Sequence, residues 1–313
     1  MRIALDAMGG DFAPEAIVKG AILAAQEIDE GTTLLLVGKE DVVHSLLKEY
    51  GYTGNNIAVV NASQVIEMGE HPTKALTQKT DSSISVGYGL LKMQKADAFC
   101  SAGNTGAMLV GSMFSVKAIE GILRPPIANL VPKVSGGYGI MLDVGANADC
   151  KPEVLEQFGM LGYIYAKYVL EIPNPKVGLM NLGEEEGKGT TVIQAAYQRL
   201  KANPNLNFIG NIEGRDLFND KADVIVCDGY TGNILLKMAE SLYEILNQKG
   251  ISDPFFDKFN YEAEGGSPIL GVNGNVVIGH GVSTPTAVKH MVLQAQKMAS
   301  TKVWERFKKH YGE

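Results

Sequence analysis

The chain has the length, composition and charge of an ordinary globular protein. Its 313 residues are 45% hydrophobic and 20% charged, which excludes a disordered chain, a fibre and a disulfide-stapled miniprotein. The formal charge of −7 argues against nucleic acid as a partner, because a nucleic-acid surface needs a basic stripe to neutralise phosphates.

Strand-like and helix-like segments alternate along the whole chain. Short apolar, β-branched runs predict strands, which we place at 2–5, 33–37, 56–60, 97–100, 139–144, 176–182, 206–209, 223–227 and 275–278. Amphipathic runs of helical period predict helices at 14–28, 41–50, 83–92, 105–119, 152–170, 190–201, 233–248 and 286–310. This alternation predicts an α/β fold with a mostly parallel sheet.

The domain organisation and the compartment follow from the same survey. No linker or repeat divides the chain, so we expect one domain over 1–313, compatible with two lobes, with a short helical excursion at about 233–265. The three cysteines are expected to be buried thiols in a reducing compartment. A strand directly after Met1 leaves no room for a signal peptide, and we expect a cytoplasmic protein.

Many of the 36 glycines cluster where predicted strands end and helices begin. They form polar turns at 6–11, 101–106, 143–149, 181–189 and 228–233. The carboxyl ends of parallel strands share one edge of a sheet, so we predict that these five turns meet at one site. Glycine-rich turns and helix N-termini present backbone N–H groups to anions, above all phosphate. Any one of the turns alone could be only a tight connection.

Several familiar kinds of site lack their parts. The sequence has no P-loop, no G-x-G-x-x-G dinucleotide motif, no G-x-S-x-G elbow and no H-E-x-x-H pair. Asp143 and Asp149 could hold a hard cation, but carboxylates at strand ends are more often turn or cap residues. We therefore expect neither a metal nor a cofactor.

The turns also carry a family resemblance. DAMGGD at 6–11, SAGNTGA at 101–107, RPPIA at 124–128, DVGAN at 143–147, NLGEEEGKG at 181–189 and DGYTGN at 228–233 resemble the bacterial phosphate acyltransferases, which make acyl phosphates from acyl-acyl carrier protein. The match covers nearly the whole chain. It implies a three-layer αβα fold similar to the isocitrate and isopropylmalate dehydrogenases and the phosphotransacetylases. It also implies a homodimer at the start of phospholipid synthesis.

The implied reaction is attack of inorganic phosphate on a thioester carbonyl, with departure of the carrier's thiol. Because phosphate is substantially dianionic and a thiol leaves readily, the site needs an oriented phosphate and oxyanion donors more than a strong base. Lys188 is the first candidate for that contact, and its alternative is a solvated lysine beside Glu184, Glu185 and Glu186. Asn233 is the second candidate, either as an oxyanion donor or as a helix N-cap.

The remaining candidates are expected to bind substrate or phosphate. Ser101, Asn104 and Thr105 form the expected phosphate cradle, with helix capping as the alternative for the last two. Lys79 with Ser82 and Ser83 could reach an anion, and His280 could stabilise a thiolate or be a turn residue. The resemblance adds Asp6, Gly9, Gly10, Asp11, Gly103, Gly106, Asp143, Asn147 and Asp228.

Partners and rival functions complete the expectations. The resemblance implies acyl carrier protein and inorganic phosphate as partners, and a downstream glycerol-3-phosphate acyltransferase at the membrane. Peripheral association with the inner face of the cell membrane would use the 233–265 excursion, which is short here, while the apolar face of 233–248 suits a second copy. The rival functions are a metal- and NAD(P)-dependent dehydrogenase of the isocitrate type and a non-catalytic binding protein for a phosphorylated metabolite.

Overall fold

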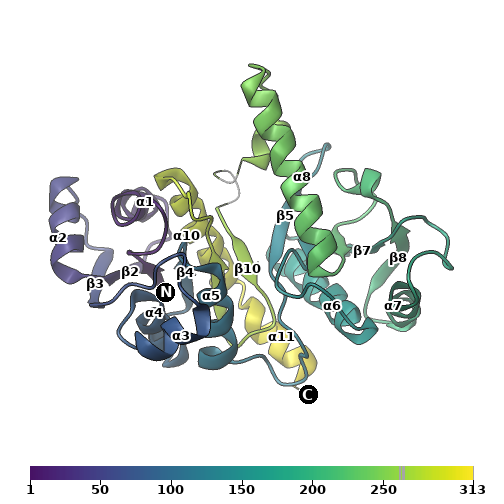
Figure 1. Cartoon of the computed structure of the whole chain (residues 1–313), viewed down its shortest axis with the longest axis horizontal. Helices are drawn as coiled ribbons and strands as arrows, with labels where there is room; N and C mark the ends of the chain where they lie inside the picture. The colour runs from purple at the N-terminus through teal and green to yellow at the C-terminus, as the bar shows by residue number, and fades with distance from the viewer. Residues whose placement is uncertain (261, 263–264, 313) are drawn as a thin grey trace. The chain divides into compact units, whose positions relative to one another are not determined.

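The computed structural model describes residues 1–260, 262 and 265–312 and divides the chain into two compact units (Figure 1). The first unit comprises Met1–Ala118 and Tyr261–Trp304, and the second comprises Ile119–Asn260 and Glu305–Glu313. The expected excursion at 233–265 includes residues 261, 263 and 264, which lie outside the described residues.

The first unit is built on a sheet with the strand order β10-β11-β4-β1-β2-β3. All neighbouring strands are parallel except β10 and β11, which are antiparallel. The strands are β1 (Arg2–Asp6), β2 (Thr33–Gly38), β3 (Ile57–Asn61), β4 (Ala98–Ser101), β10 (Ser267–Ile269) and β11 (Asn275–Ile278). Strands β11, β4 and β1 are neighbours, so the loops after them leave the same edge of the sheet.

Helices cover this sheet and supply much of its core. They are α1 (Glu15–Ala25), α2 (Glu40–Glu49), α3 (Pro72–Gln78), α4 (Ser83–Lys92), α5 (Thr105–Gly111) and α10 (Pro285–Ser300). A π-helical turn, Ser112–Val116, continues α5. Fully buried Tyr88 of α4 packs edge-to-face on Phe99 of β4, with ring centroids 4.9 Å apart, a geometry that adds to burial alone.

The second unit has its own sheet, with the order β5-β6-β9-β7-β8. Its strands are β5 (Ala128–Pro132), β6 (Tyr138–Leu142), β7 (Lys176–Met180), β8 (Asn207–Ile212) and β9 (Val224–Val226), parallel except for the β5–β6 pair. The helices are α6 (Pro152–Tyr168), α7 (Thr191–Ala202), α8 (Gly229–Gln248) and α11 (Val303–Tyr311), with 3-10 turns at Gly214–Asp216 and Phe256–Phe259.

The predicted α/β class is confirmed, and the expectation of one sheet is wrong. The described residues form two sheets in a three-layer α/β architecture, each mostly parallel with one antiparallel edge strand. The sequence survey missed those edge strands, β5 and β10. Both contain a proline, which suits a sheet edge but weakens a strand prediction. The helix α3 was also missed, because only Ala75 of it is buried and it has no apolar stripe.

Two predicted helices are interrupted at residues with a left-handed backbone. The segment 286–310 is not continuous: α10 ends at Ser300, and Lys302 has a φ of 53° before α11 begins. A left-handed residue cannot continue a right-handed helix. The segment 105–119 ends its α-helix at Gly111 and passes through the π-helical turn to Lys117, whose φ is 67°.

The chain after α8 folds back onto its own unit. Phe259 is buried, and Phe255 and Phe259 both pack on Phe218, with centroid distances of 5.9 and 4.9 Å. These rings therefore contribute to a local aromatic cluster. No helix in the described part of the chain is long and apolar enough to cross a membrane.

Candidate active site

In the first unit, Asp6 braces the loops that follow β1 and β4. Its fully buried carboxylate accepts hydrogen bonds from the Ser101 hydroxyl at 2.6 Å and from the backbone N–H of Met8 at 3.0 Å. Burial raises the pKa of Asp6, while hydrogen bonds from Ser101, Ser83 and nearby backbone amides lower it. The two loops pack so closely that a Cβ on Gly9 would lie 2.3 Å from Asp6 Oδ2 and 2.8 Å from the Gly103 nitrogen.

A third loop, after β11, joins the same edge. The Asp11 N–H donates to the Gly281 carbonyl at 2.7 Å, and the Gly279 N–H donates to the Ser101 carbonyl at 2.8 Å. The exposed His280 lies between these two anchor points. The structure thus brings the loops at 6–11, 101–106 and 279–281 together, as the sequence predicted for the first two.

Asn104 uses its whole side chain for structure. Its Oδ1 accepts from the Ala107 N–H at 2.9 Å as the N-cap of α5, and its Nδ2 faces the carbonyls of Glu67, Met68 and Glu70 at 3.0–3.1 Å. The capping alternative therefore describes this residue.

Thr105 is exposed, whereas Lys79 and Ser82 are engaged in contacts within the protein. Thr105 is exposed at the first position of α5. Lys79 donates to the Val65 carbonyl at 2.6 Å and forms a very short ion pair with Glu70. Ser82 caps α4, accepting from the Ser85 N–H at 3.2 Å. The ammonium of Lys79 is therefore engaged within its own loop.

In the second unit, Asp143 plays the part that Asp6 plays in the first. Its buried carboxylate follows β6 and accepts from the N–H groups of Ile127, Gly145, Ala146 and Asn147 at 2.6–3.2 Å. Asn147 Nδ2 adds a hydrogen bond of 2.9 Å. Burial raises the pKa of Asp143, and these donors oppose the rise. Its bonds organise the turn, as expected for a turn carboxylate.

The helix α8 starts against that turn. Asp228 is its N-cap, accepting from the Thr231 N–H at 2.8 Å, and the Gly229 N–H donates to the Asn147 carbonyl at 2.7 Å. Asn233 is therefore not the N-cap: the alternative we weighed for it is wrong, because the helix begins four residues earlier. Its exposed side chain faces Gly145, where an added Cβ would lie 3.6 Å from Asn233 Oδ1.

Lys188 lies in the loop between β7 and α7. Asn181 closes this loop by donating from Nδ2 to the Lys188 carbonyl at 3.1 Å. The Lys188 side chain is 48% exposed, and its Nζ is 4.0 Å from Glu185 Oε1. Because β6, β9 and β7 are adjacent and parallel, the loops carrying Asp143, Asp228 and Lys188 leave one edge of the second sheet.

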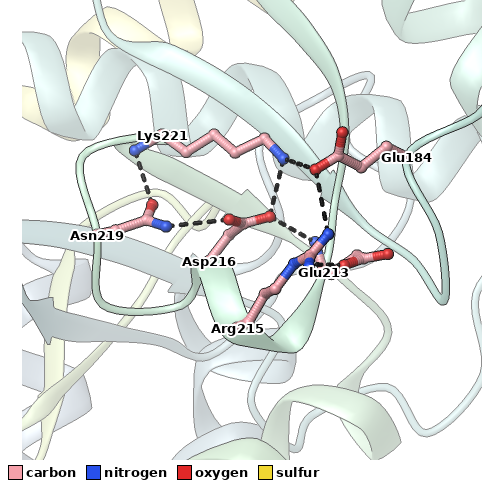
Figure 2. Close-up of polar contacts among 6 residues, drawn as sticks. All are labelled: Glu184, Glu213, Arg215, Asp216, Asn219 and Lys221. Atoms are coloured by element: carbon pink, nitrogen blue, oxygen red, sulfur yellow. Dashed lines mark hydrogen bonds and ion pairs between the residues drawn. The ribbon is translucent and has the colours of Figure 1, made fainter.

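Glu184, another glutamate of this loop, is paired with two cations outside the loop. Figure 2 shows Glu184 beside Lys221 and Arg215, at 2.6 and 3.7 Å. Lys221 also contacts the buried carboxylate of Asp216 at 2.9 Å. Burial acts to raise the pKa of Asp216, but hydrogen bonds from Lys221, the Glu213 N–H and Asn219 outweigh it and lower that pKa to about 2.

The sequence survey did not find Lys221, Arg215 or Asp216. They lie outside the glycine-rich turns, in and beside a 3-10 turn, and no local pattern links them to Glu184. The signal that could have found them is the capping-box arrangement of Glu213 and Asp216.

The arrangement offers two sets of anion donors on two sheet edges. The first unit supplies glycine-rich backbone around Gly9, Gly103 and Thr105, and the second supplies the exposed side chains of Lys188 and Asn233. Such donors can hold a phosphate and a developing oxyanion. Within the described residues, no three His, Cys, Asp or Glu side chains are grouped to hold a metal ion. The meeting of all five turns at one site stays a prediction.

A solved structure has the same fold. A phosphotransacetylase from Streptococcus pyogenes aligns over 96% of this chain and 94% of its own, with a TM-score of 0.68 at 18% identity. The chain therefore has the phosphotransacetylase type of α/β fold.

Sequence comparison then gives the family. The model of the fatty acid synthesis protein family matches residues 1–306, and the chain belongs to that family. The phosphate acyltransferase of Dictyoglomus turgidum is 44% identical over 97% of this chain and 95% of its own. That of Syntrophomonas wolfei is 46% identical over 92% and 91%. The predicted family resemblance is confirmed.

Proposed function

We propose that the protein transfers a fatty acyl group from acyl-acyl carrier protein to inorganic phosphate. The observation that carries this proposal is the similarity to phosphate acyltransferases over nearly the whole chain. A phosphate oxygen forms a bond to the thioester carbonyl carbon, and the carbon–sulfur bond breaks. The phosphate proton passes to the departing thiolate, so the products are acyl phosphate and the free thiol of the carrier.

The first unit is proposed to hold the phosphate. Backbone N–H groups around Gly9, Gly10 and Gly106, with the hydroxyl of Thr105, present donors to an anion, and the Gly103 N–H donates to the Ser101 hydroxyl at 3.0 Å and so helps to shape the same loop. Asp6 is buried, so its role is to brace these loops through Ser101 and Met8. Braced loops keep their donors oriented, which lowers the entropic cost of positioning the nucleophile. Asp11, Lys79, Ser82, Ser83, Asn104 and His280 belong to the same loops or support them.

The second unit is proposed to carry Lys188 as the contact for phosphate or for the oxyanion, and Asn233 as a donor to the oxyanion. Lys188 is the exposed cation of its loop, and Asn233 offers an amide N–H from the second turn of α8. Charge develops on the carbonyl oxygen as phosphate attacks, and donors aimed at that charge contribute more in the transition state than in the ground state. Asp143, Asn147 and Asp228 hold the turn and the helix that carry Asn233.

The oligomer and the cellular setting are also proposals. In the described chain, α8 exposes the apolar side chains of Ile234, Met238, Leu242 and Ile245 to between 40% and 52%. This stripe at helical spacing suits a second copy of the chain. We further propose one phosphate acyltransferase domain of two lobes, related in fold to the isocitrate dehydrogenases. It would work in the cytoplasm or at the inner membrane face and supply a downstream glycerol-3-phosphate acyltransferase.

The experiment is incubation of the protein with acyl-acyl carrier protein and inorganic phosphate, with hydroxylamine to trap acyl phosphate as a hydroxamate. Hydroxamate that forms only when phosphate is present, without nucleotide or nicotinamide, is the expected result. Phosphate-independent hydroxamate would contradict the proposal. Reduction of a nicotinamide with a hydroxy acid would favour the dehydrogenase, and phosphate binding without turnover would favour the binding protein.

A further inference from the structure

The loop that carries Lys188 contains three consecutive carboxylates, Glu184, Glu185 and Glu186, just before it. If all three faced its ammonium group, the local charge would be negative and a phosphate dianion would be repelled. All three glutamates lie close to Lys188 in the sequence, so the direction in which each side chain points decides the charge that an incoming anion meets.

Glu184 is held by a network on the neighbouring turn. Its Oε1 lies 2.6 Å from the Lys221 ammonium, which is in turn 2.9 Å from Asp216 Oδ2 (Figure 2). Asp216 is nearly buried and also accepts from Asn219 Nδ2 at 3.0 Å. The Lys221 ammonium therefore bridges two carboxylates, that of buried Asp216 and that of exposed Glu184.

Glu186 is held by two side chains of the helix α7. Its two oxygens accept from Gln198 Nε2 at 2.6 Å and from the Lys201 ammonium at 2.9 Å. Glu185 is the carboxylate that remains near Lys188, at 4.0 Å. Its carbonyl is fixed by the Lys188 N–H at 3.0 Å and by Asn211 Nδ2 at 2.9 Å.

We propose that Lys221 and Lys201 are positioning residues that keep Glu184 and Glu186 away from Lys188, so that its ammonium stays available to phosphate. The inference rests on the proposed function, and it assigns a role to side chains that lie outside every glycine-rich turn. Glu184 and Glu186 are exposed in their pairs with Lys221 and Lys201, and exposed pairs contribute little to stability, so the effect of these two pairs on the charge of the loop is the property to test.

The central variant is Lys221→Met, which removes the 2.6 Å pair and leaves Glu184 with the longer 3.7 Å contact to Arg215, so that Glu184 is held less firmly and can turn toward Lys188. We expect the KM for inorganic phosphate to rise roughly five-fold at low ionic strength, with kcat within about two-fold of the unchanged protein. Adding Glu184→Gln to Lys221→Met removes the freed charge and should restore the KM. Both variants leave Asp216 without its cation, so they should lose similar stability, and only the KM should distinguish them.

A second ion pair and a control variant extend the test beyond Lys221. Lys201→Met, on an exposed pair, should raise the phosphate KM and be restored by Glu186→Gln. Lys289→Met is the matched control, because Lys289 pairs with Glu27 at 2.9 Å with exposures close to those of Lys221 and Glu184, but in the first unit. It should leave the phosphate KM unchanged.

The outcomes separate the inference from the function on which it rests. An unchanged KM in Lys221→Met and Lys201→Met overturns the inference. So does a raised KM that the glutamine substitutions fail to restore, since the effect would then be structural. An unchanged phosphate KM and kcat in Lys188→Ala also overturns it, whereas trapped acyl phosphate from the unsubstituted protein, measured in the same assay, decides the proposed function separately.

Discussion

Gly232 and Asp143 approach so closely that a Cβ on residue 232 would lie 1.9 Å from the Asp143 carbonyl oxygen. No real Cβ tolerates such a contact, so glycine at this position is a packing requirement of the first turn of α8. The same contact places the helix, and Asn233 with it, directly against the turn that Asp143 organises.

Gly232→Ala is therefore expected to destabilise the second unit by about 3 kcal/mol, in the range of backbone clashes that cannot relax. Equilibrium unfolding in urea, followed by circular dichroism, measures the change. Gly187→Ala is the control, because no atom lies within 4 Å of the position that its Cβ would take. Equal stability of the two variants would mean that the start of α8 can shift to make room.

Lys188→Ala and Asn233→Ala should fold normally and turn over slowly. Both side chains are exposed, so truncation costs little stability, while loss of one donor to a developing oxyanion typically costs about 10²–10³ in rate. The hydroxamate assay measures the rate, and Lys237→Ala, one turn along α8 from Asn233, serves as the control. A folded variant that keeps most of its turnover would reduce its residue to a loop or helix-surface role.

Asp216 should make the stability depend on acid pH. Its pKa in the folded protein is about 2, below the ordinary 3.8, so the stabilisation is present above about pH 4 and is lost as the pH falls toward 2. Asp216→Asn should cost about 2 kcal/mol near neutral pH and flatten the decline between pH 4 and 2.

Unfolding curves at several pH values test this expectation. Asp149→Asn, an exposed residue of a turn in the same unit, is the matched substitution and should leave the curves unchanged. If Asp216→Asn shows the same loss between pH 4 and 2 as the unsubstituted protein, the acid sensitivity belongs to other carboxylates.

Leu242→Glu should disrupt the proposed dimer. It places a charge in the middle of the exposed stripe of α8, and burying an unpaired charge against a partner is costly. Light scattering should give a dimer for the unsubstituted protein and a smaller mass for the variant, while Glu244→Gln should not change the mass. A monomeric unsubstituted protein, or a dimeric Leu242→Glu variant, would defeat the interface.

We expect α8 to serve as a dimer contact before it serves as a membrane contact. The polar face of α8 carries Glu240 and Glu244, and anionic lipid favours cations on that face. Sedimentation with anionic liposomes should therefore leave most of the protein in solution. Strong sedimentation would reverse the ranking.

The sequence by itself determined the strand–helix alternation and the positions of the glycine-rich turns. These depend on local periodicity and on residues such as Asp6 and Asp143 at strand ends, which a reader can find without knowing any long-range pairing. The family resemblance depends on the same short segments, and for that reason the sequence alone carries it.

Only the tertiary structure decided how strands distribute between two sheets and which charges meet. Strand β11 pairs with β4, whose partner residues (Asn275 with Ala98, for example) are far apart in the chain, and Glu184 meets Lys221, 37 positions later. Nothing local encodes either pairing. Asn104 shows the same limit on a smaller scale: its place before a helix predicted a cap or a phosphate ligand equally well. The choice was made by three carbonyls of the Glu67–Glu70 turn, which its amide can reach only in the folded chain.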